Sequence, residues 1–206
     1  MTDEQTFRAT CGAIMLVAMP VGAYHRLRAN RVGAKIRHEA EPLWMRATLK
    51  LTAVLAGVVV VLWFVRPSLV LGWAHLALPT WLRWTGAGMM VSSVPLVWWT
   101  FHTLGHNLTD TVETRANGFL VVSGPYRFVR HPFYTTVALF VAGFVLLSAL
   151  WPIGVLMGIA LALLAVRTPL EERKLIERFG DEYVRYAART WRYFPRPWRN
   201  VARDSS

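Results

Sequence analysis

The sequence contains little cysteine and few acidic residues. Cys11 is the single cysteine among 206 residues, which excludes a disulfide framework and a cluster of thiolate metal ligands. Twelve Asp and Glu stand against 23 Lys and Arg, so the formal net charge is +11. In a soluble protein this charge would favour nucleic acid as a partner, but 54% of the residues are hydrophobic and ten are Trp. The composition therefore predicts an integral membrane protein whose basic residues face lipid headgroups, with no nucleic-acid partner.

Five apolar segments have the composition of membrane-spanning helices. They cover residues 7–24, 47–65, 82–101, 133–151 and 152–166. The first has an acidic start and no small-residue cleavage site after it, so we interpret it as a retained helix and not as a signal peptide. Pro152 marks a tight turn, which predicts that the last two segments form a helical hairpin. The expected fold class is an all-α integral membrane protein with about five transmembrane helices, built as one domain over residues 1–206.

The basic residues predict how these helices are oriented. Seven Lys and Arg lie in residues 24–50, three in 102–132 and ten in 167–206. An N-terminus outside the membrane places all three regions on the cytoplasmic side, as the positive-inside rule requires. The basic loop 24–46 could also contact an acidic substrate. Because a composition rich in Arg, Ala and Val is typical of a bacterial source, we expect the inner membrane.

Residues 124–134, Gly-Pro-Tyr-Arg-Phe-Val-Arg-His-Pro-Phe-Tyr, form an unusual loop between two apolar segments. Each of its two prolines fixes its own φ and restricts the residue before it, so the loop is stiff. Its polar side chains are of kinds that hydrogen-bond ligands. The stretch is consistent with a ligand clamp at the membrane face, or with a basic membrane-surface turn that carries aromatic anchors.

The end of the last apolar helix carries a second group of charges. Arg167 and Glu171 are four residues apart and share a helix face, which is typical of an ion pair on a helix surface. Two features favour a functional site: the Arg precedes the Glu, the weaker order for such a pair, and both lie where a membrane helix emerges. Gly180 is expected to end this helix, as Gly105 is expected to end the helix over 82–101. Asp181 is expected to cap a short helix that follows Gly180.

Two further sequence patterns resemble ligand-binding motifs but lack some of their residues. Gly86-Ala87-Gly88 lacks the third glycine of a nucleotide fingerprint and has no strand before it, so we expect these small residues to let a neighbouring helix approach closely. His102 and His106 have a metal-ligand spacing, but no Glu lies between them and no third ligand is evident. We predict no metal site.

Four sequence segments follow one another in a recognisable order. They are Leu-Gly-His-Asn at 104–107, Gly-Phe-Leu-Val at 118–121, Gly-Pro-Tyr-Arg-x-Val-Arg-His-Pro-x-Tyr at 124–134 and Arg-x3-Glu-Glu-x2-Leu-x3-Phe-Gly-x2-Tyr at 167–183. In these segments the sequence resembles the isoprenylcysteine carboxyl methyltransferase family, which is similar to the integral-membrane phospholipid methyltransferases. The first three helices, within residues 1–101, carry no motif. Residues 102–198 would hold the catalytic loop, the hairpin and a C-terminal cytoplasmic segment.

The resemblance implies S-adenosylmethionine as methyl donor, held in a cytoplasmic pocket. It implies that Arg167 orients the acceptor. The positions that match cofactor contacts are Gly118, Phe119, Leu120, Val121, Tyr126, His131, Pro132, Phe133, Tyr134 and Glu171. The chain departs from many relatives in having Gly118 in place of His and Thr136 in place of Gly.

The chemistry of the acceptor stays open at the level of sequence. An isoprenylcysteine-type carboxylate is ionised at neutral pH and needs no general base. An amine would need one, for which His102, His106 and Glu172 are candidates; a phospholipid or a small thiol are further lipophilic or small-molecule acceptors. Two other functions compete: an NADPH-dependent membrane reductase of the sterol type, and a membrane scaffold without activity.

Overall fold

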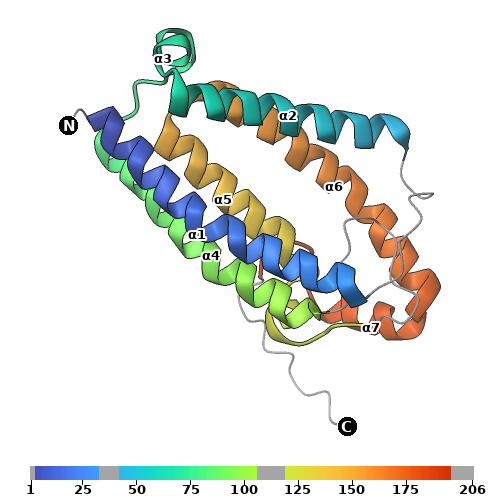
Figure 1. The fold of residues 1–206 in the computed structure, drawn as a ribbon. Coiled ribbons are helices and arrows are strands. Elements are labelled where there is room, and N and C mark those ends of the chain that lie inside the picture. The colour runs from blue at the N-terminus through green and yellow to red at the C-terminus, as the bar shows by residue number, and fades with distance from the viewer. Residues whose placement is uncertain (1–2, 33–41, 106–118, 196–206) are drawn as a thin grey trace.

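The computed structural model describes residues 3–32, 42–105 and 119–195, and its described part is dominated by helices. Four of the five predicted segments lie each in one long helix; the fourth, 133–151, runs past the end of α5 at Ser148 to Trp151, the first residue of α6 (Figure 1). The long helices are α1 (Asp3–Val32), α2 (Leu43–Val65), α4 (Thr80–Leu104), α5 (Pro132–Ser148) and α6 (Trp151–Phe179). The short helices α3 (Ser68–Ala74), η2 (Gly124–Arg127) and α7 (Asp181–Arg189) complete the described part. The prediction of an all-helical fold is confirmed for the described residues.

Three of the long helices are apolar and long enough to cross a membrane. They are residues Asp3–His25 of α1, all of α2 and helix α6, while α5 is apolar but shorter. These helices support an integral membrane protein. The count of five crossings and the orientation with the N-terminus outside remain predictions.

Helices α4 and α5 form the closest pair in the fold, and glycine makes this approach possible. A Cβ atom added to Gly86 would lie 2.6 Å from the carbonyl oxygen of Gly143, and one added to Gly143 would lie 2.6 Å from that of Gly86. Any side chain at either position would therefore collide with backbone. The expectation that small residues at 86–88 admit a neighbouring helix is confirmed at Gly86. Gly88 has no atom near its would-be Cβ.

The predicted helical hairpin is present. Helix α5 ends at Ser148, Ala149 adopts a left-handed conformation with φ of 55°, and α6 begins at Trp151 with Pro152 in its first turn. Proline fits there because the first-turn N–H groups of a helix have no intrahelical partner. Helix α6 packs along α2, and it continues past its apolar part to bring its charged end to the loop before α5 (Figure 1).

The helix ends agree with the sequence at two glycines and differ at one acid. Gly105 and Gly180, with φ of 53° and 52°, end α4 and α6 as expected. The prediction that Asp181 caps α7 is wrong, because Gly180 occupies the N-cap position and no side chain caps this helix. Asp181 is instead the first residue of α7, where its charge is favourable to the positive end of the helix.

Candidate active site

The loop that carries the Arg-His-Pro segment is held against the end of α4. Gly124 has a φ of 58°, and a Cβ atom there would lie 2.5 Å from the hydroxyl oxygen of Thr103. Only glycine tolerates both conditions. The short helix η2 follows, His131 caps α5, and Pro132 is the first residue of that helix. The stiffness predicted from the two prolines thus places His131 and Tyr134 at the start of α5.

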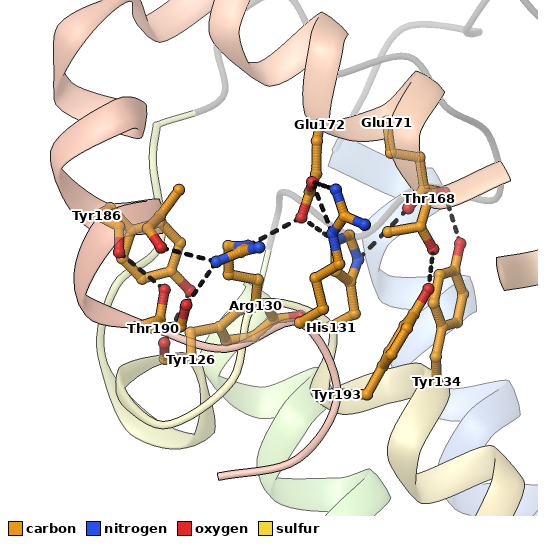
Figure 2. A network of polar contacts seen from close by, with 12 residues as sticks. Tyr126, Arg130, His131, Tyr134, Thr168, Glu171, Glu172, Tyr186, Thr190 and Tyr193 are labelled. Atoms are coloured by element: carbon orange, nitrogen blue, oxygen red, sulfur yellow. Dashed lines mark hydrogen bonds and ion pairs between the residues drawn. The ribbon is translucent and has the colours of Figure 1, made fainter. Parts of the chain in front are cut away.

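Glu171 on α6 is contacted by side chains from this loop and from its own helix. Its Oε1 accepts a hydrogen bond from the Tyr134 hydroxyl at 2.5 Å (Figure 2) and another from Arg167 Nε at 2.8 Å. The Nδ1 atom of His131 lies 3.5 Å from Oε2. The side chains of Arg167 and Glu171 expose only 9% and 15% of their surface. The ion pair expected from the spacing is therefore present, but it is a largely buried cluster and not an exposed surface pair.

Glu172, the next residue, is bonded by arginines and also lies near His131 (Figure 2). Its Oε1 accepts a hydrogen bond from Arg130 Nε at 2.8 Å and lies 3.4 Å from His131 Nε2. Its Oε2 accepts two bonds from Arg192, at 3.0 and 2.7 Å. The hydrogen bond to Glu172 raises the pKa of Arg192 above its usual range, so that this side chain stays charged. His131 consequently lies between two carboxylates.

The chain after α7 folds back onto the same loop. The carbonyl oxygens of Trp191 and Arg192 accept hydrogen bonds from the backbone N–H groups of Arg130 and His131, at 2.6 and 2.9 Å. The Tyr193 hydroxyl donates to Thr168 Oγ1 at 2.7 Å, and its ring lies 6.0 Å from that of His131. The C-terminal segment therefore fixes the backbone and the ring of His131 together.

Three tyrosines lie behind this cluster, on η2 and α7. The Tyr186 hydroxyl donates to the carbonyl oxygen of Tyr126 at 2.7 Å. The Tyr183 hydroxyl is buried without a hydrogen-bond partner. Burial raises the pKa of Tyr186 to about 12 and raises those of Tyr126 and Tyr183 above their ordinary values. All three hydroxyls stay protonated at neutral pH and act only as neutral polar groups.

The predicted site residues fall into three groups. His131, Tyr134, Arg167 and Glu171 are in mutual contact around one carboxylate. Pro132 is buried, and Phe133 packs on Phe101 of α4 with ring centroids 5.3 Å apart. In the segment before η2, Val121 is buried whereas Phe119 is 65% exposed, and Leu120 lies between them. Gly118 and His106 lie outside the described residues.

Four further side chains belong to the cluster but were not predicted to act in it. These are Arg130, Thr168, Arg192 and Tyr193. Arg130 lies in the quoted loop motif, which was the available signal. Arg192 and Tyr193 lie after the matched segments, where the sequence shows no pattern. Among the described residues, no three His, Cys, Asp or Glu side chains gather as they would around a metal ion.

Comparison with known proteins bears on the same part of the chain. Residues 86–177 match the sequence model of the isoprenylcysteine carboxyl methyltransferase family. The chain is 31% identical over 112 residues to the cobalt-zinc-cadmium resistance protein CzcN of Cupriavidus metallidurans. That match covers 53% of this chain and 46% of the relative, so the chain spans about half the length of the curated relative it matches.

A solved structure shares the fold. The chain is similar to the eukaryotic intramembrane Ras methyltransferase ICMT, with a TM-score of 0.56 and 20% identity, over 90% of this chain and 66% of that one. The segment matched by the family model includes the Arg-His-Pro loop, Arg167 and both glutamates. The matched segment is therefore similar to the isoprenylcysteine carboxyl methyltransferase family, and the solved structure shows that the membrane fold is shared.

Proposed function

We propose that this protein transfers a methyl group from S-adenosylmethionine to a lipophilic acceptor at the cytoplasmic face of the membrane. The reaction is most like carboxyl O-methylation of an isoprenylcysteine-type substrate. The observation that carries the proposal is the Glu171 carboxylate, which lies at the Arg-His-Pro loop within the segment that matches the family. The cytoplasmic face is inferred from the distribution of basic residues.

The hydrogen bonds around Glu171 leave an acceptor position for the amino group of S-adenosylmethionine. Among the described residues, both close hydrogen bonds, from Tyr134 and Arg167, go to Oε1, whereas Oε2 has His131 alone, at 3.5 Å. An ionised carboxylate has about four acceptor positions, so Oε2 can accept an ammonium group without displacing either close donor. When bound, the cofactor supplies an electrophilic methyl group on a sulfonium. The roles proposed for residues 118–121, Tyr126, Pro132 and Phe133 are to line the site.

Arg167 is proposed to orient the acceptor. A guanidinium next to the methyl donor can hold an acceptor carboxylate by charge-assisted hydrogen bonds. Because a carboxylate is already ionised, the protein needs to contribute positioning and exclusion of water and no proton transfer. The packing of Tyr193 and the C-terminal segment on His131 covers the loop from one side, which supports such exclusion.

An amine acceptor would require a general base, and the described candidates are poorly placed for that role. Glu172 is occupied by Arg130 and Arg192. His102 stacks on Trp98, with ring centroids 4.8 Å apart. These contacts favour a carboxylate or a thiol over an amine. A thiol stays a second candidate acceptor, because its solution pKa of about 8.5 leaves a fraction of it ionised near neutral pH. Such an acceptor could be a small molecule and not a prenylated protein.

The test is methyl transfer in membranes that contain the protein. Membranes are incubated with methyl-labelled S-adenosylmethionine, and lipid, protein and small-molecule fractions are separated. We expect label in a base-labile ester of a lipidated acceptor, and much less of it with Glu171→Gln at a concentration of S-adenosylmethionine that does not saturate the protein. Calorimetry with NADPH and with S-adenosylmethionine is run in parallel, since binding of NADPH alone would contradict the proposal and favour a reductase. Binding of neither ligand would favour a scaffold without activity.

A further inference from the structure

A groove lies between the start of α1 and the end of α2. These two helix ends lie at the end of the bundle away from the Arg-His-Pro loop (Figure 1). Its volume is about 440 Å³. The polar residues of its lining are at the beginning of α1, and the remainder are apolar or small. The lining residues are Gln5, Arg8, Ala9, Gly12, Ala13, Leu16 and Phe64. Gly12 lies next to the ring of Phe64, which would be in van der Waals contact, at 3.5 Å, with a Cβ atom added to this glycine.

Arg8 contributes a positive charge to this groove without a carboxylate to offset it in the described part of the chain. Its Nη1 donates to the carbonyl oxygens of Trp63 and Phe64, at 3.3 and 3.5 Å, in the last turn of α2. Its Nε is buried without a hydrogen-bond partner. Helix spacing would favour Glu4 as the partner of Arg8. Glu4 instead accepts hydrogen bonds from Trp63 and Arg83, both at 2.8 Å.

The surroundings place Arg8 at the level of a lipid headgroup. Exposed tryptophans, which concentrate at membrane–water interfaces, lie at the same end of the bundle: Trp73, Trp81 and Trp151. Leu16 lies eight residues further along α1, about 12 Å deeper at a rise of about 1.5 Å per residue. The groove therefore has a cationic mouth at the interface and an apolar floor in the hydrocarbon layer.

We propose that this groove binds a phospholipid, with its phosphate on Arg8 and one acyl chain along Gly12, Leu16 and Phe64. A guanidinium suits phosphate because its N–H groups match two oxygens at once, and an unpaired charge at the edge of a bilayer gains most from such a partner. Helix α1 packs mainly on α4, and α2 mainly on α6. The bound lipid would therefore lie across two helices whose main packing partners differ. The proposal does not depend on the methyltransferase reaction.

The test uses the full chain purified in detergent and native mass spectrometry to count retained lipid, with thermal unfolding as a second readout. The probes are dioleoyl phosphatidylglycerol, the matched diacylglycerol that lacks the phosphate, and inorganic phosphate. We expect one tightly retained phosphatidylglycerol and a rise in melting temperature that neither of the other probes reproduces. An equal rise with diacylglycerol would overturn the role of Arg8, and an equal rise with inorganic phosphate would show a free-anion site instead.

Three variants distinguish a specific lipid-binding site from non-specific binding of lipid to the protein surface. Arg8→Gln removes the charge and should weaken lipid retention about tenfold or more, as expected for the loss of a hydrogen bond to a charged group. Ala13→Phe fills the groove from an exposed position and keeps the charge, so it decides the matter if Arg8→Gln fails to fold. Arg66→Gln is the control, because Arg66 is exposed at the same end and does not line the groove. Equal retention by all of them would refute the proposal.

Discussion

Substitution of Glu171 by Gln is expected to weaken S-adenosylmethionine binding about ten- to a hundredfold. The change keeps the size of the side chain and removes its charge. A hydrogen bond to a charged group contributes about 1.5–3 kcal/mol, and about 1.4 kcal/mol corresponds to a factor of ten in affinity. The close donors Tyr134 and Arg167 both bond to Oε1, so an amide oxygen in that place can retain them. The loss should therefore be in ligand binding more than in folding.

Substitution of Arg167 by Ala should act differently. Glu171 keeps its contacts with Tyr134 and His131, so cofactor affinity is expected to stay within about threefold. Turnover should fall about a hundredfold, because a misplaced acceptor loses the benefit of orientation. Arg167 donates to Oε1 of Glu171, so the two residues are in direct contact. We therefore expect that the effects of the two substitutions do not add in the double variant.

The assay combines calorimetry with S-adenosylmethionine and methyl transfer in nanodiscs. Glu177→Gln is the matched control, because Glu177 pairs with Lys174 on the same helix and 66% of its side chain is exposed. An exposed pair of this kind is worth at most about 1 kcal/mol, and neither readout should change. If Glu171→Gln and Arg167→Ala behave like this control, the cluster is structural. If Arg167→Ala abolishes cofactor binding and Glu171→Gln does not, the two roles are reversed.

His131→Ala and Tyr134→Ala should each lower cofactor affinity while the protein stays folded; calorimetry showing unchanged affinity in both would remove the loop from the site. Glu172→Gln should lower the free energy of unfolding by about 1.5–3 kcal/mol, since it removes the charge and replaces one of the two oxygens that accept from Arg130 and Arg192 by an amide NH2; denaturant unfolding would contradict this by showing no shift. Gly86→Ala should lower the stability of the fold by about 1–3 kcal/mol through overpacking, as measured by thermal unfolding. Gly88→Ala, with open space around the new Cβ atom, should be neutral or stabilising in that measurement. A C-terminal reporter that is active only in the periplasm should be silent, because ten basic residues lie in 167–206, and a strong signal would refute the orientation.

Much of the fold was predictable because local sequence patterns determine where its helices lie. Apolar runs predict long helices, and the glycines at 105 and 180 predict where two of them end. The short helix α3 was not predicted, since seven residues carry too little periodicity. Asp181 was misassigned because both Gly and Asp are common at helix starts, and only the backbone conformation decides between them.

The contacts of charged residues across the fold could not be predicted. Glu4 and Arg83 lie 79 residues apart, and no spacing rule connects them. Arg192 reaches Glu172 only because the chain reverses after α7 and places its carbonyl oxygens on the Arg-His-Pro loop. Such contacts depend on tertiary packing, so composition and periodicity carry no signal for them.

The two adjacent glutamates show how structure separates what sequence presents as a pair. Neighbouring residues on a helix point about 100° apart, so Glu171 faces Tyr134 while Glu172 faces Arg130 and the C-terminal segment. Both oxygens of Glu172 are taken by close arginine donors. Glu171 has close donors on Oε1 alone, which leaves Oε2 with acceptor capacity. The coordination of the two carboxylates thus assigns Glu172 to holding the loop in place and makes Glu171 the better candidate for a cationic ligand.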